Sequence, residues 1–269
     1  MHKKTTVLFS ALIVVALVYP FAFSKADKPD LVLDLPEAEG VYAVPNHPNL
    51  KLRVFVHSAK GQSGKPTVTP TEVCASSSVV DPDSSAVVHP AGWNLPSIWE
   101  YQLNLSSAPS SIGSVNMGEI ARNAFADWEG AVSSSVTIFE GAPTVADRAL
   151  FDGQNIITWG RTSGTALAVS YIWYDQITGV AKEVDTIFNK KFKWYWSNPD
   201  TWPAGEECAF QGVYDAENIL THELGHTMGL DDEYGSEYAN NTMYGYGDKT
   251  ETKKDTLTSG DILGVQALY

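Results

Sequence analysis

The chain has 269 residues and a formal net charge of −14 at pH 7, from 32 acidic and 18 basic side chains. An acidic surface repels a phosphate backbone unless basic residues gather in one patch, and Lys190-Lys191 and Lys253-Lys254 are too short for that, so nucleic acid is excluded as the expected partner. The length suits one domain of ordinary size with an extension, and no internal repeat is evident.

The first residues have the pattern of a signal peptide. Lys3 and Lys4 give a positive start, residues 7–18 are apolar, and small residues near Ser24 provide a cleavage site. We therefore expect residues 1–24 to be removed and the mature protein to be a secreted, extracellular monomer without stable membrane association. An uncleaved segment would make it a cell-surface protein, but Pro20 and the modest apolar length favour cleavage.

Residues 25–95 form either an ordered N-terminal extension or a removable propeptide, and the sequence leaves this choice open. Apolar and polar residues alternate in Leu52–Val56 as in a strand, and residues 60–66 have the composition of a loop. Residues 70–96 are rich in Ser, Pro and Asp. The extension carries three histidines that we expect to be surface residues and not metal ligands: His47, His57 and His89.

Residues 96–269 show the strand and helix patterns of one domain. Apolar residues spaced by one, three and four predict a helix over residues 117–130 that packs on a sheet. A turn sequence, Asp175–Gly179, predicts a hairpin between two strands. Runs rich in β-branched and aromatic residues predict strands at residues 101–104, 136–139, 155–159, 166–174 and 182–188.

A metal-binding pattern, HExxHxxGxxD, begins at His222 and predicts a metal-dependent hydrolase. We expect its helix to begin near Asp215, whose side chain can cap the free amides, and to end at Gly229. On that helix His222 and His226 lie on one face and present both imidazoles to one ion, with Glu223 beside the open coordination position.

The third metal ligand is suggested by the positions of the six histidines, because none of them follows His226. Unless a histidine from the N-terminal half enters the site, a carboxylate must complete the three protein ligands of a catalytic zinc. Asp232 is the best placed candidate. Asp231 ranks second and Glu233 third, because they point differently from the same turn.

With these features the sequence resembles the matrixins, a family of zinc endopeptidases in the metzincin clan. The zinc motif is one similarity, although Asp232 stands where the family usually has histidine. A second is Asn241–Tyr244, which resembles the turn whose methionine, here Met243, forms an apolar floor under the zinc. The third is Leu257–Tyr269, which resembles the closing helix, and weaker matches reach upstream to Trp99.

The resemblance implies an α+β fold class for residues 96–269, a metzincin-like catalytic domain. Its twisted, mostly parallel sheet would have an antiparallel edge strand, an active-site helix and a C-terminal helix. The implied activity is that of a secreted zinc-dependent endopeptidase. His222, His226 and Asp232 would hold the catalytic Zn²⁺, and Glu223 would act as general base for a zinc-activated water that hydrolyses the peptide bond.

Protein or peptide substrates are the partners that the resemblance implies. In matrixins an edge strand pairs with the extended substrate, and we expect Glu183–Asn189, the second hairpin arm, to border this cleft. No Ca²⁺ site is derived, because Asn189-Lys190-Lys191 stands where the family has an acidic cluster. Side-chain preference is not inferred either, because Tyr244–Gly247 replaces the usual proline-containing stretch.

Two other functions remain open at this point. One is a catalytically inactive metal-binding or adhesion protein on the same fold, against which the intact Glu223 speaks. The other is a zinc protease of another clan with Glu233 as the third ligand, which the glycine turn and Met243 make less favoured.

The two cysteines, Cys74 and Cys208, have two interpretations. In an exported protein a pair most simply forms a disulfide. Matrixins, however, often stay latent through a propeptide cysteine that binds the zinc, and Cys74 lies upstream as such a residue would. Its neighbours lack the arginine, glycine and proline that surround the family's switch cysteine, so the disulfide is favoured.

Overall fold

The computed structural model describes residues 35–60, 69–133, 135–162 and 164–269, which belong to one compact unit. The predicted signal peptide, residues 1–24, lies outside the described residues, as do residues 61–66 of the predicted loop. Among the residues described, no helix has the length and apolar character needed to cross a membrane.

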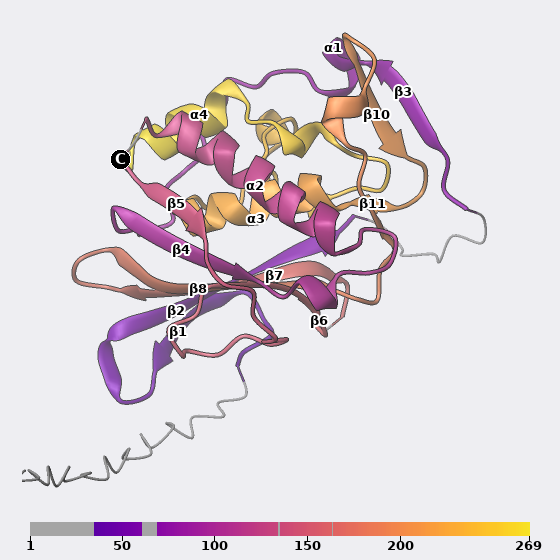
Figure 1. Cartoon of the computed structure of the whole chain (residues 1–269). Coiled ribbons are helices and arrows are strands. Elements are labelled where there is room, and N and C mark those ends of the chain that lie inside the picture. The colour runs from indigo at the N-terminus through magenta and orange to yellow at the C-terminus, as the bar shows by residue number, and fades with distance from the viewer. Residues whose placement is uncertain (1–34, 61–68, 134, 163) are drawn as a thin grey trace, which may run out of the picture. The chain divides into compact units, whose positions relative to one another are not determined.

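An eight-stranded sheet forms the centre of this unit (Figure 1). The strand order is β1 (Gly40–Val44), β2 (His47–Ala59), β7 (Ala166–Asp175), β8 (Val180–Asn189), β6 (Ile156–Gly160), β4 (Ile98–Leu103) and β5 (Thr137–Glu140), and β12 (Tyr246–Gly247) pairs with β2 off this path. The neighbouring strands β8, β6, β4 and β5 pair in parallel, whereas β7 runs antiparallel to β8. This mixed, mostly parallel arrangement confirms the predicted α+β class.

The hairpin of β7 and β8 has its turn where the sequence predicted it, but one expectation about it is wrong. Its second arm, β8, was expected to border the substrate cleft. Instead β8 is an interior strand, because it pairs with β6 on one side and with β7 on the other. Both faces of β8 are buried over most of its length, so its alternating sequence does not mark a sheet edge. The first arm, β7, pairs with β8 on one side and with β2 on the other.

Two strands of the N-terminal extension enlarge the sheet beyond β7. The longer one, β2, pairs antiparallel with β7 from Leu50 to Ser58. At its end it also pairs in parallel with β12, where Ser58 lies opposite Tyr246 and Ala59 opposite Gly247. The extension is therefore integrated into the sheet next to β7.

Three helices cover one face of this sheet, as Figure 1 shows: α2 (Ser114–Ala131), α3 (Ala216–Met228) and α4 (Ser259–Gln266). The apolar positions that predicted α2 are buried against the main core, as the spacing required. The indole of Trp128 on α2 donates a 2.8 Å hydrogen bond to the carbonyl of Thr221 on α3. The apolar core and this bond together fix the position of α3 over the sheet.

A small second sheet ties the extension to the segment before α3. In it β3 (Glu72–Ser76) pairs antiparallel with β10 (Glu206–Phe210), and a disulfide joins Cys74 to Cys208 across the pair. Cys74 is therefore engaged with Cys208 and does not act as a zinc ligand in this structure. The remaining elements are short: α1 (Ser77–Val80), β9 (Trp194–Tyr195), β11 (Tyr214–Asp215) and the 3-10 turns Leu105–Ser107, Pro199–Thr201, Ser236–Tyr238 and Lys253–Asp255.

Candidate metal centre and active site

The ends of α3 are built by the two residues that the sequence indicated. The side chain of Asp215 accepts hydrogen bonds from the backbone N–H groups of Glu217 and Asn218, which caps the first turn. Gly229 ends the helix with φ 103°, a left-handed conformation that glycine adopts without the steric cost of a Cβ. All residues of α3 are buried, so its histidines face the protein interior.

Backbone carbonyls orient the imidazoles of His222 and His226. Nδ1 of His222 lies 2.7 Å from the carbonyl oxygen of Thr242, and Nδ1 of His226 lies 3.0 Å from that of Leu230. Because a carbonyl only accepts, each Nδ1 carries a proton, so Nε2 is the atom that each ring has left to bind a metal. Burial lowers the pKa of His222 to about 4. Burial also acts to lower the pKa of His226, but the carboxylate of Asp232 outweighs burial and raises that pKa above its usual value.

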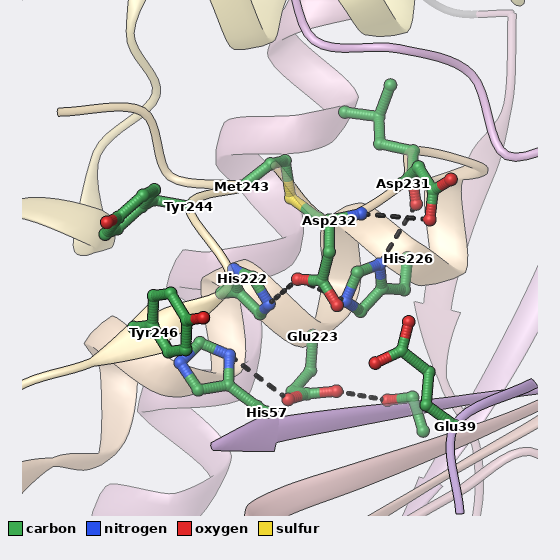
Figure 2. Close-up of polar contacts among 12 residues, drawn as sticks. Glu39, His57, His222, Glu223, His226, Asp231, Asp232, Met243, Tyr244 and Tyr246 are labelled. Carbon is green, nitrogen blue, oxygen red and sulfur yellow. Dashed lines mark hydrogen bonds and ion pairs between the residues drawn. The ribbon is translucent and has the colours of Figure 1, made fainter. Parts of the chain in front are cut away.

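Asp232 lies opposite both lone pairs (Figure 2). Its Oδ1 is 3.2 Å from Nε2 of His222 and 3.5 Å from Nε2 of His226, and its side chain is 1% exposed. Burial acts to raise the pKa of Asp232, but the two histidines outweigh burial and hold the pKa well below its usual range. The carboxylate is therefore ionised.

The three facing atoms fit a metal ion. None of Nε2 of His222, Nε2 of His226 and Oδ1 of Asp232 has a hydrogen-bond partner, although all three are buried. Lone pairs this close repel one another unless a cation lies among them. Two imidazole nitrogens and one carboxylate oxygen are ligands that a catalytic zinc takes, so these residues suit that ion.

Glu223 lies beside this cluster with one carboxylate oxygen fixed and the other free. Its Oε2 accepts a 2.6 Å hydrogen bond from Oγ of Ser170 on β7, whereas the buried Oε1 has no hydrogen bond. Burial raises the pKa of Glu223 to about 7. A carboxyl group with a pKa in this range both accepts and releases a proton near neutral pH.

Met243 packs directly against α3 next to the cluster. A Cβ built on Gly225 would meet Sδ of Met243 at 2.1 Å and the ring of Trp128 at 2.8 Å, so only glycine leaves room for the methionine. The buried carboxylate of Asp261 on α4 accepts hydrogen bonds from the backbone N–H groups of Thr242 and Met243. In this way α4 holds the turn whose carbonyl orients His222.

The other two acidic candidates for the third ligand point elsewhere. The carboxylate of Asp231 accepts a 3.2 Å hydrogen bond from Arg53. Oε1 of Glu233 lies 2.9 Å from the backbone N and 2.6 Å from Nδ1 of His89. Among the described residues, the carboxylate that gathers with His222 and His226 belongs to Asp232.

His57 is the residue whose place the sequence did not reveal. It was expected on the surface, but it is 0% exposed, and its ring centroid lies 3.9 Å from that of His222. Its Nδ1 is 3.7 Å from Oε1 of Glu223. His47 is exposed as expected, and the side chain of His89 is 70% exposed. The alternation in residues 52–56 indicated a strand but not the surface that the strand would cover.

Lys254 is a second residue that sequence patterns did not single out. Its side chain is fully buried, and its Nζ donates hydrogen bonds to the backbone carbonyls of Tyr244 and Tyr246. Burial lowers the pKa of Lys254 to about 8. The lysine therefore holds the segment after Met243 in place. This segment contains β12, which pairs with β2 on the side opposite β7.

Comparison with protein-family models matches the chain to the Matrixin family over residues 99–269. The matched region contains α3, Asp232 and Met243, whereas β1 and β2 precede it. No curated protein matches the chain.

Proposed function

Because the chain belongs to the matrixin family of zinc metalloendopeptidases, we propose that His222, His226 and Asp232 hold a catalytic zinc and that Glu223 is the general base of peptide hydrolysis. One observation carries this assignment. Three buried acceptor atoms without hydrogen-bond partners face one another, and the free oxygen of a carboxylate lies beside them.

The residues divide the reaction among them. Zinc, when bound, supplies a Lewis acid that polarises the scissile carbonyl and makes a water more acidic. Oε1 of Glu223 takes one proton from the attacking water while the water oxygen bonds to the carbonyl carbon. The Glu223 carboxyl group then gives that proton to the amine nitrogen as the carbon–nitrogen bond breaks. Ser170 holds Oε2 and so keeps Oε1 turned toward the site.

The proposed substrate is a protein segment in extended conformation. Within the matched residues 99–269, β7 is the last strand on its side of the sheet, so its outer N–H and C=O groups need a partner strand. A substrate that adds to this edge forms the missing ladder of hydrogen bonds. It also passes close to Glu223, because Ser170 of β7 contacts that residue.

We also propose that the protein is exported. The basic and then apolar start of the sequence supports this location, because signal peptides have that order. The disulfide between Cys74 and Cys208 supports it independently, since such bonds persist in oxidising compartments.

The test is Glu223→Gln in the zinc-loaded chain. The substitution keeps the size of the side chain and removes the proton acceptor, so we expect cleavage of an unstructured protein such as casein to slow by about 10²–10⁴-fold. Zinc content should stay unchanged, because Glu223 is not one of the proposed ligands. Casein fragments separated by electrophoresis and zinc measured by atomic absorption give the two readouts.

Glu237→Gln is the matched control. It makes the same chemical change at an exposed residue outside the cluster. It should cleave at the wild-type rate. Equal and measurable cleavage by wild type and Glu223→Gln would remove Glu223 from the mechanism.

A further inference from the structure

A strand of the N-terminal extension lies in the groove where we propose that substrate binds. β2 is hydrogen-bonded on one side to β7 and on the other side to β12. Lys60 extends this second pairing, since its N–H bonds to the carbonyl of Gly247 at 3.0 Å. β2 thus fills the space between the outer strand of the matched region and the segment that follows Met243.

The pairing of β2 is the pairing that an added peptide would form. Nine consecutive residues, Leu50 to Ser58, lie opposite β7 in an antiparallel ladder. The family match begins at residue 99, so β2 is not part of the shared domain and covers an edge that this domain leaves unpaired. An extended segment that satisfies a sheet edge excludes any second strand from the same edge.

Alternate side chains of β2 point at the proposed catalytic residues. The ring of Phe55 stacks on that of His226 with centroids 3.7 Å apart and an interplanar angle of 5°. Arg53 lies over Phe55 and bonds to Asp231, next to the proposed ligand Asp232. With β2 in place, His222, Glu223 and His226 are all 0% exposed, so a substrate reaches them only when β2 leaves the groove.

His57 is the side chain of β2 that enters the site itself, as Figure 2 shows. It lies among His222 and Glu223 with potential ligand atoms within 4.8 Å of one another. Both of its ring nitrogens are buried and neither has a hydrogen-bond partner. A histidine that only filled the core would normally satisfy at least one nitrogen. The free Oε1 of Glu223 also faces His57, at 3.7 Å from Nδ1.

We propose that β2 is the chain's own occupant of the substrate groove and that His57 closes the metal site as a fourth protein ligand, next to His222, His226 and Asp232. The imidazole then takes the coordination position that the attacking water needs, and it separates Glu223 from solvent. This inference rests on the proposed function. In the resting chain a histidine then closes the metal site, because the disulfide with Cys208 keeps Cys74 from binding the metal.

X-ray absorption at the zinc edge tests the assignment directly in the full chain. We expect three imidazole ligands in the wild type, from His57, His222 and His226, and two in His57→Ala. His57→Phe is the second variant, because it keeps a ring in the buried space and should also show two. His47→Ala is the matched control, since His47 is an exposed histidine of the same strand and its loss should leave three.

A second readout follows access to the metal. In the cobalt-loaded chain, acetohydroxamate should change the visible spectrum of His57→Ala at lower concentration than that of wild type or His47→Ala. Faster casein cleavage by His57→Ala than by wild type is expected in addition. Circular dichroism confirms that each variant is folded.

The outcomes separate the two proposals. Two imidazoles in wild type and in His57→Ala alike, with equal response to acetohydroxamate, would overturn the role of His57 and leave the zinc centre standing. A folded wild-type chain that binds neither zinc nor cobalt would overturn the proposed function itself.

Discussion

Two backbone carbonyls decide what the imidazoles of α3 are able to bind. By fixing the protons on Nδ1, Thr242 and Leu230 leave both Nε2 atoms as acceptors that point at Asp232. Such second contacts set ring orientation and ligand strength at metal sites. The sequence predicted His222, His226 and Asp232 from spacing and from the absence of later histidines, but not the carbonyls, because they depend on how the chain folds back.

Asp232→Ala is the prediction that belongs to this scale. It removes the charged ligand, so we expect zinc affinity to fall by more than about 100-fold, at or beyond the upper end of the loss caused by changing an outer-shell partner. Competition with a chromogenic chelator measures the affinity. Asp231→Ala is the matched control and should keep its zinc, since that carboxylate bonds to Arg53. Equal affinities in the two variants would contradict Asp232 as the ligand.

At the scale of elements, α3 fits the site through a close approach that only glycine permits. The sequence predicted the beginning and end of this helix, because a capping aspartate and a terminal glycine act locally. It did not predict the need for Gly225, whose neighbours Met243 and Trp128 come from distant parts of the chain. The sequence also predicted β8, and not β7, as the strand beside the groove. That error has the same origin, since strand order is a property of the whole sheet.

Gly225→Ala tests this close approach. The added methyl group would overlap the buried side chains of Met243 and Trp128, so we expect a loss of about 1–3 kcal/mol in the free energy of unfolding. Gly130→Ala in α2 is the matched control, because a Cβ there meets nothing within 4 Å. That variant should gain about 0.5–1 kcal/mol from the helical preference of alanine. Urea unfolding measures both, and a stabilised Gly225→Ala would contradict the packing described.

At the scale of the whole molecule, the metal site joins segments that are far apart in the sequence. α3 supplies two proposed ligands, the following turn supplies Asp232, α4 holds the Met243 turn, and β2 covers the cluster. A cation among the facing acceptors should therefore stabilise the entire fold, because the unfolded chain has no such site.

Removal of metal tests this coupling. Addition of a chelator to the zinc-loaded chain should lower its Tm, and a free zinc concentration 100 times the Kd corresponds to about 2.7 kcal/mol of added stability. Differential scanning calorimetry with and without chelator measures the change. In Asp232→Ala the two scans should coincide. A wild-type Tm that does not respond to the chelator would argue against a metal in this cluster.

The sequence by itself determined the parts of this protein that depend on neighbouring residues: the limits of α3, the spacing of its histidines and Glu223, and the hairpin turn. It also indicated Asp232, because the order of histidines along the chain left few alternatives, and its resemblance to the matrixins implied the α+β class. Only the tertiary structure decided that β7 lies toward the groove and that β2 covers it, so that His57 lies beside His222. Contacts between segments that are distant in the sequence depend on strand order and register, and the alternation within a strand does not specify its partner.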